Sequence, residues 1–182
     1  TADGLLGGST PERRLEIMSD SATGAFGVVT VGLMVVAQVV CVAIVYSSRD
    51  WWALGAAPVA GRLAASLCVF TRTPARAEGL GASAARRPTA IGVALALLAL
   101  AVTLGGGAFD VLIGRAGAVS WTITHAALAL FALAVAHVTC RGLTRPIGGY
   151  TGDTLGATIV YVETATLFVA AAWAVAQGGW PL

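Results

Sequence analysis

"GAFGVVTVGLMVVAQVVCVAIVY", residues 24–46, is an uncharged apolar stretch that decides the class of fold. A helix of about 20 apolar residues is long enough to cross the hydrocarbon core of a bilayer. Comparable stretches lie at residues 51–70, 89–109, 118–140 and 154–176. We therefore predict an all-α fold: a polytopic integral membrane bundle of about five transmembrane helices, in which residues 1–182 form a single transmembrane domain.

The overall composition agrees with a membrane protein. Of the 182 residues, 57% are hydrophobic and 11% are charged, and the mean hydropathy is +0.83, whereas a soluble domain has about 25% charged residues. The net charge of +2 is small, and no basic run is interleaved with aromatic residues. Nucleic acid is therefore excluded as an expected partner, and the lipid bilayer is the expected environment.

The arginines of the loops predict the orientation, because cytoplasmic loops of membrane proteins carry an excess of basic residues. If the N-terminal segment is cytoplasmic, eight loop arginines lie inside and two lie outside. The inside set is Arg13, Arg14, Arg72, Arg76, Arg86, Arg87, Arg141 and Arg145, and the outside set is Arg49 and Arg115. This orientation brings residues 1–23, 71–88 and 141–153 to the cytoplasmic face, which we expect to carry the chemistry.

A short helix is predicted on that face before the first span, in the segment STPERRLEIMSDS. Thr10 suits the N-cap, Pro11 suits the first helical position, and Glu12 is favourably placed against the helix dipole. The helix is expected to end near Asp20.

Three aspartates of this face are candidate metal ligands. Asp3 and Asp20 flank the short helix, so their carboxylates meet only if the GLLGGS turn between them folds back. Together with Asp153 they offer the hard oxygen ligands that Mg²⁺ takes when it bridges substrate phosphates. The alternative is that Asp20 and Asp153 only cap or border helices.

The glycines at 148, 149, 152 and 156 admit two explanations, since glycine lets a backbone approach a phosphate and also lets membrane helices pack closely. We favour helix packing for Gly156. For Gly148 and Gly149, which precede the last span, we favour a tight turn or an anion-binding nest.

Arg62 and Glu163 are the charged residues inside the spans, where ionisable groups are costly and often functional. They form either a buried ion pair or a direct contact to an anionic substrate. His125 and His137 lie about 120° apart on a helix, which argues against a shared metal site and leaves them to packing or hydrogen bonding. The cysteines at 41, 68 and 140 show no paired spacing, so we expect reduced, buried side chains.

Four segments, in order along the chain, carry a family resemblance. They are TADG at 1–4, RRLEIMSDSATGAFG at 13–27, GRLAASLCVF with ARAEGLG at 61–81, and GGYTGDTLGA at 148–157 with Glu163. They resemble the adenosylcobinamide-GDP ribazoletransferase family, also called cobalamin synthase, whose first motif reads H-x-D-G-x-x-D-T-x-D-G. We expect the rest of that motif and at least one membrane segment to lie before Thr1. Val160 and Gln38 depart from the residues that many relatives carry, a glutamate and a lysine.

The resemblance implies a Mg²⁺-dependent transferase of late cobalamin biosynthesis in the bacterial cytoplasmic (inner) membrane, with its active face cytoplasmic. It would join adenosylcobinamide-GDP to α-ribazole or its 5′-phosphate and release GMP. A homo-oligomer, or contacts with other cobalamin-assembly enzymes, stays open. The metal ligands would be Asp3, Asp20 and Asp153, with Asp153 also as the catalytic base. The substrate-binding residues would be Arg13, Arg62, Arg145, Gly148, Gly149, Thr151, Gly152 and Glu163.

The rival class is a membrane transporter or channel subunit in which Arg62 and Glu163 line a polar path. Such a protein is expected to have paired broken helices in two related halves, and the sequence shows no internal repeat. A membrane scaffold protein would leave the aspartates without a purpose. Another transferase acting on nucleotide-activated alcohols is the nearest alternative among enzymes.

Overall fold

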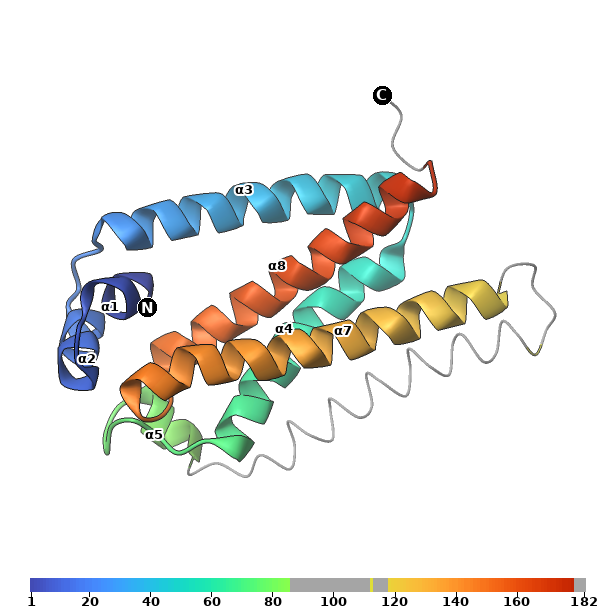
Figure 1. Ribbon diagram of the computed structural model, residues 1–182. Coiled ribbons are helices and arrows are strands. Elements are labelled where there is room, and N and C mark those ends of the chain that lie inside the picture. Colours follow the sequence, from blue (N-terminus) through green and yellow to red (C-terminus); the bar gives the residue numbers. More distant parts are fainter. Residues whose placement is uncertain (86–111, 113–117, 179–182) are drawn as a thin grey trace.

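The computed structural model describes residues 1–85, 112 and 118–178, and in that part of the chain it is helical apart from one isolated β-bridge. In the described part of the chain, four helices are long and apolar enough to cross a membrane (Figure 1). They are α3 (Ala25–Ser47), α4 (Trp51–Thr71), α7 (Ala118–Thr144) and α8 (Gly152–Ala176). The predicted all-α membrane bundle is confirmed. The expected span at 89–109 lies outside the described residues.

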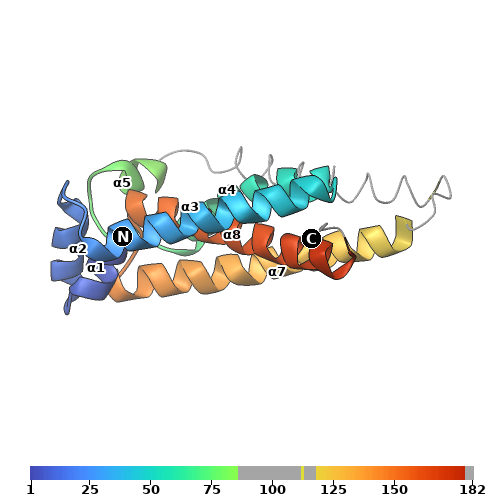
Figure 2. The same cartoon turned by 90° about the horizontal axis from the view of Figure 1, so that it is seen from above.

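Helix α8 is the centre of the bundle, because it contacts α3, α4 and α7 (Figures 1 and 2). Its buried stripe repeats every fourth residue, a spacing that keeps side chains on one face of a helix. The stripe consists of Thr154, Thr158, Val162, Thr166, Ala170 and Ala174. These side chains are small or β-branched, so the neighbouring helices approach closely, as is typical of membrane bundles.

The hydroxyl groups of the buried threonines of α8 form hydrogen bonds within their own helix. Thr158 Oγ1 donates to the Thr154 carbonyl at 2.7 Å, and Thr166 Oγ1 donates to the Val162 carbonyl at 2.7 Å. A buried hydroxyl without a partner destabilises the fold. These local bonds remove that penalty, so a row of threonines can face the apolar core of the bundle.

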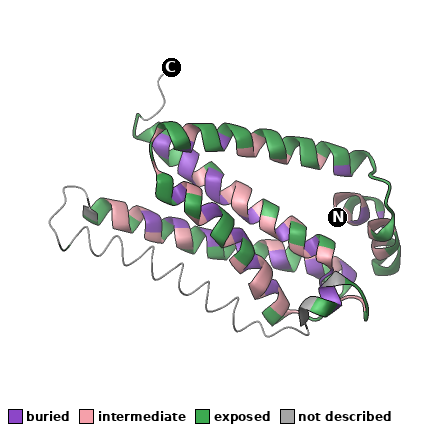
Figure 3. Ribbon diagram, turned by 180° about the vertical axis from the view of Figure 1, so that it is seen from behind, coloured by how far each residue is buried: buried purple, intermediate pink, exposed green. Residues whose placement is uncertain are grey.

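The helices beside α8 present matching small residues. On α4 the buried positions are Ala53, Ala57, Gly61, Ala64 and Cys68. On α7 they include Leu128, Ala132, Ala136, Cys140 and Thr144. Helix α3, in contrast, is exposed along most of its length, and its outward side chains are mainly valines (Figure 3). An apolar outer surface of this kind suits contact with lipid.

Four shorter elements gather at one end of the bundle: α1 (Ala2–Gly7), α2 (Pro11–Ser19), α5 (Leu80–Ala85) and the 3₁₀ turn η1 (Arg145–Ile147) (Figure 1). We call this end, with residues 72–79 and 148–153, the motif end. The predicted helix is confirmed as α2: Thr10 Oγ1 accepts from the Arg13 N–H at 3.2 Å, Pro11 is the first residue, and Asp20 follows the last. Helix α1 was not predicted; the chain folds back after it, so that α1 contacts both α2 and α3.

The observed spans differ from the predicted ones by up to four residues at their ends. Helix α7 runs past Cys140 to Thr144, because Arg141 is favourable in a last turn, and Pro146 follows in η1. Helix α8 begins two residues earlier than expected, because Thr151 and Thr154 form a capping box at its start.

The expectation for the cysteines is wrong at two positions. Cys68 on α4 and Cys140 on α7 form a disulfide with a Cα–Cα distance of 5.6 Å, whereas Cys41 is free and buried. The two partners are 72 residues apart in the sequence. Their pairing depends on how α4 and α7 rotate against each other, which no local pattern reveals.

Candidate functional site

The glycine-rich turn at residues 148–151 packs against the segment that follows α4. The Tyr150 N–H donates to the Thr73 carbonyl at 3.0 Å, and the Ala75 N–H donates to the Tyr150 carbonyl at 2.8 Å. A Cβ on Gly149 would lie 2.5 Å from the Thr73 carbonyl oxygen, so only glycine permits this approach. Gly148 adopts a left-handed φ of 74°, which closes η1. The predicted tight turn is therefore present.

The first turn of α8 uses one predicted side chain for capping and leaves another exposed. Thr151 Oγ1 accepts from the Thr154 N–H at 3.2 Å and is buried, so its hydroxyl is already engaged. Asp153 is exposed, and no hydrogen bond to its carboxylate is formed within the described residues. Asp153 thus borders the helix, as the alternative interpretation expected, but Thr151 is the cap.

The start of helix α1 contacts the first turn of α8. Thr1 Oγ1 donates to the Asp153 carbonyl at 3.0 Å. Two residues later, Asp3 caps the start of α3: its carboxylate oxygens accept from the Gly24 N–H at 3.0 Å and from the Gly27 N–H at 2.9 Å. The structure therefore brings the starts of α1, α3 and α8 together, with Asp3 committed to capping.

Asp20 lies at the end of α2, where its Oδ1 accepts from the Ala22 N–H at 2.9 Å. All three aspartates are thus at the motif end. However, no three His, Cys, Asp or Glu side chains form a metal-binding group in the described part of the chain. The three aspartates therefore do not form one metal-binding group within the described residues. Asp153 is the aspartate whose carboxylate is exposed and not engaged by a described N–H group.

Two arginines that the sequence analysis did not single out hold the motif end together. Arg14 on α2 donates from Nε to the Gly8 carbonyl at 2.9 Å and from Nη1 to the Pro146 carbonyl at 3.1 Å. Arg76 donates from Nη2 to the Leu15 carbonyl. Both side chains bind backbone carbonyls far away in the sequence, and no local signal could have identified these contacts.

The predicted phosphate-binding arginines differ in their availability. Arg13 pairs with Glu16 at 2.7 Å on the exposed face of α2. Arg145 is exposed in η1 and forms no ion pair with a described carboxylate. Arg62 already pairs with a carboxylate of a neighbouring helix.

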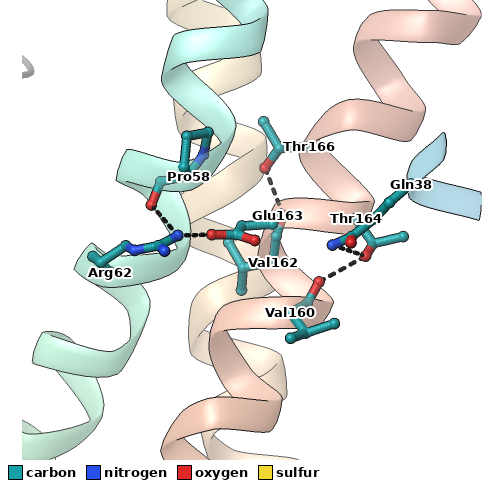
Figure 4. A network of polar contacts seen from close by, with 8 residues as sticks. All are labelled: Gln38, Pro58, Arg62, Val160, Val162, Glu163, Thr164 and Thr166. Atoms are coloured by element: carbon teal, nitrogen blue, oxygen red, sulfur yellow. Dashed lines mark hydrogen bonds and ion pairs between the residues drawn. The ribbon is translucent and has the colours of Figure 1, made fainter. Parts of the chain in front are cut away.

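Inside the bundle, Arg62 of α4 and Glu163 of α8 form an ion pair between Nη1 and Oε1 (Figure 4). Arg62 Nη1 also donates to the Pro58 carbonyl at 3.2 Å. The Glu163 side chain is 17% exposed and that of Arg62 is 64% exposed, so the carboxylate lies in the interface and the guanidinium reaches outward. The ion pair expected as one alternative is present, but it is not fully buried, because the Arg62 side chain is exposed. Beside it, Gln38 Nε2 donates to Thr164 Oγ1 at 3.1 Å, which links α3 to α8.

The close helix contact at this level occurs at Gly61 rather than at Gly156. A Cβ on Gly61 would lie 2.7 Å from Glu163 Cγ and 2.9 Å from the Ile159 carbonyl oxygen. A Cβ on Gly156 would meet no atom within 4 Å among the described residues. The expected packing role of Gly156 thus finds no partner among the described helices, and it stays a prediction.

Comparison with known proteins identifies the family that the chain resembles. Residues 1–171 match the family described as Cobalamin-5-phosphate synthase. Proteins named adenosylcobinamide-GDP ribazoletransferase are similar: that of Bradyrhizobium diazoefficiens is 37% identical over 177 residues, covering 95% of this chain and 62% of the relative. That of Syntrophobacter fumaroxidans is 37% identical over 178 residues, covering 93% and 64%. That of Stutzerimonas stutzeri is 38% identical over 174 residues, covering 92% and 63%. The chain thus spans less than two thirds of the length of these relatives, and no solved structure matches it.

Proposed function

The chain belongs to the Cobalamin-5-phosphate synthase family, and on this premise we propose that its protein joins adenosylcobinamide-GDP to α-ribazole or its 5′-phosphate and releases GMP. The reaction takes place at the motif end, which faces the cytoplasm from the bacterial inner membrane. The observation that carries the proposal is the contact between two of the resembling segments. Gly81 of the EGLG segment lies against the backbone of Thr151 and Gly152, where an added Cβ would be 3.2 Å away.

The start of α8 is the proposed reaction centre. The N-terminus of a long helix favours anions, because its unpaired N–H groups and its dipole point outward. Arg145 lies in η1, shortly before the start of α8 in the sequence. It forms no ion pair with a carboxylate of the described residues, which supports a role in binding a phosphate group. Arg13 is a further phosphate ligand if Glu16 releases it. Gly148, Gly149 and Gly152 shape the backbone against which the substrate lies.

In the reaction, the hydroxyl of ribazole attacks the phosphorus attached to cobinamide. A new oxygen–phosphorus bond forms, the bond from that phosphorus to the GMP oxygen breaks, and GMP leaves. The proton of the attacking hydroxyl passes to the Asp153 carboxylate. Phosphoryl transfer of this kind needs positioning and charge neutralisation more than a covalent nucleophile, which suits a site of fixed backbone groups and arginines.

Mg²⁺ is the proposed cofactor and would neutralise charge on the pyrophosphate. The described residues fit an ion held by one or two carboxylates together with substrate phosphates, which is the usual form of a magnesium site. Asp153 would be the first ligand, because its carboxylate is exposed. Asp20 would be the second, and Asp3 would contribute chiefly by positioning the start of α3, since both of its oxygens accept N–H groups there.

The contact between Arg62 and Glu163 supports a structural role for both residues over direct substrate binding. It also weakens the transporter alternative, because each charge is neutralised by the other. In the described residues α3, α4, α7 and α8 are continuous helices, without the paired breaks expected of a transporter.

The test uses the full-length gene product in membranes, with release of GMP from adenosylcobinamide-GDP measured in the presence and absence of α-ribazole and Mg²⁺. Asp153→Asn is compared with Glu12→Gln, which also removes a carboxylate from the first turn of a helix at the motif end. We expect release that needs both additions, a loss of at least about 100-fold in Asp153→Asn, and wild-type rates in Glu12→Gln. Folded protein that releases no GMP would overturn the proposal.

A further inference from the structure

Two buried polar atoms at the motif end form no hydrogen bond within the described residues: Arg72 Nε and Tyr150 Oη. The Tyr150 side chain is 1% exposed. Buried polar groups in native proteins nearly always have a partner, and those that lack one call for an explanation such as a ligand. Neither residue belongs to the site that the sequence predicted.

The backbone brings the segments of the two residues side by side. Arg72 directly follows α4, with φ −131° and ψ 157°. Tyr150 pairs in parallel with Pro74, two residues after Arg72. The two atoms without a partner therefore belong to neighbouring segments of the motif end.

The charge of Arg72 is also without a partner, unlike that of its neighbours. At the motif end Arg13 pairs with Glu16, and Arg14 and Arg76 bind backbone carbonyls. Arg72 forms no ion pair or side-chain hydrogen bond with any described residue. The residue as a whole is partly exposed, so it is not sealed within the bundle.

We infer that Arg72 and Tyr150 form a subsite that binds a phosphate group of the GDP moiety of the substrate. A guanidinium matches phosphate oxygens bidentately, and a phenol adds one hydrogen-bond donor. The start of α8, one residue after Thr151, adds its N-terminal dipole beside them. The inference rests on the proposed function for the identity of the ligand, while the anion subsite itself is defined by these two residues.

The protonation of Tyr150 agrees with a donor role. Burial raises the pKa of its phenol, so the hydroxyl keeps its proton at neutral pH and donates to an anion. In the proposed subsite the phosphate supplies the partner that Tyr150 Oη lacks.

The kinetic test compares the full-length wild type with Arg72→Gln, Arg72→Lys, Tyr150→Phe and the matched control Arg141→Gln, an exposed arginine on α7. In Arg72→Gln we expect the KM for adenosylcobinamide-GDP and the inhibition constant of GMP to rise about 10-fold or more, as for loss of a hydrogen bond to a charged group. Tyr150→Phe should raise both by about 3- to 10-fold. Arg72→Lys should lie between wild type and Arg72→Gln. The KM for α-ribazole should not change.

A binding measurement separates this inference from the proposed reaction. Inorganic pyrophosphate should raise the unfolding midpoint of the wild type and of Arg141→Gln, but not that of Arg72→Gln or Tyr150→Phe. If the wild type releases no GMP and this pattern still appears, the subsite stands and the proposed reaction fails. If pyrophosphate stabilises all variants equally, or stabilises none, the inference is overturned. If Arg72→Gln does not fold, the same kinetic and unfolding measurements are made on Arg72→Lys and Tyr150→Phe. Wild-type values in both of these variants would overturn the inference.

Discussion

The carboxylate of Asp3 accepts a hydrogen bond from the Gly27 N–H at 2.9 Å, across 24 residues of sequence. Its other oxygen accepts from the Gly24 N–H at 3.0 Å. Asp3 therefore serves as a cap supplied from outside helix α3, and it fixes α1 to the membrane span. A Cβ at either glycine would overlap the carboxylate, which explains why the ATGAFG segment has glycine at both positions.

Gly27→Ala should destabilise the protein by about 1–3 kcal/mol, because the new methyl group displaces the Asp3 carboxylate. The matched control is Gly32→Ala on the same helix, where a Cβ would meet no atom within 4 Å. That change should be neutral or slightly stabilising, since alanine favours helix over glycine. Thermal unfolding of the purified full-length protein measures both. Equal midpoints for the two variants would show that the Asp3 cap is absent.

The ion pair between Arg62 and Glu163 should behave as a coupled unit. Glu163→Gln leaves the guanidinium without its carboxylate and should destabilise by about 1–3 kcal/mol. Adding Arg62→Gln removes the isolated charge, so the double variant should recover much of the loss. The measurement is a double-mutant cycle of unfolding midpoints. Strictly additive losses would mean that the two side chains do not interact in the membrane.

Asp50 lies at the end of the bundle opposite the motif end, and it should make the stability of the protein depend on pH. It caps α4 through the Ala53 N–H at 3.0 Å and contacts His125 Nε2 at 3.2 Å, which confirms the expected hydrogen-bonding role of His125. Burial raises the pKa of the Asp50 carboxyl, but the hydrogen bonds from His125 and Ala53 and the charge of His125 outweigh this and lower the pKa below its ordinary 3.8.

A carboxyl whose pKa is lowered by folding stabilises the protein fully above its unfolded pKa and loses that contribution as the pH falls through the folded pKa. Wild type and Asp50→Asn should therefore differ most above about pH 5 and converge as the pH falls below 3.8. Asparagine retains the capping oxygen, so the difference isolates the charge. Unfolding midpoints of both proteins between pH 3 and 7 test this. A gap that stays constant across the range would contradict it.

Cys68 and Cys140 should be recovered as a linked pair of peptides when the protein is digested without reductant. Both sulfur atoms lie in the core between α4 and α7, so a maleimide should label neither cysteine before the bond is reduced and the protein is unfolded. Cys41 is the internal control, because it is buried but free and should react once the protein is unfolded without reductant. Labelling of all three cysteines under that condition would exclude the bond.

The sequence determined the features that depend on neighbours within a turn or on the composition of a whole segment. Four of the predicted spans were found within a few residues of their observed bounds, and α2 begins and ends where Thr10, Pro11 and Asp20 indicated. Residues 1–23, 71–88 and 141–153 were expected on one face, and the structure brings their described parts to one end of the bundle. These features follow from helix length, capping and hydropathy, which are local or additive.

The tertiary structure decided which of the motif residues are free to act. Both Asp3 and Thr151 looked available in the sequence, yet their side chains cap helices. Conversely, Arg72 and Tyr150 were not predicted as site residues, yet each has a buried donor atom that lacks a partner among the described residues. Contacts of this kind join residues tens of positions apart, and they depend on the rotation of each helix about its axis. A membrane span shows little polar periodicity to set that rotation, so packing between small residues sets it instead.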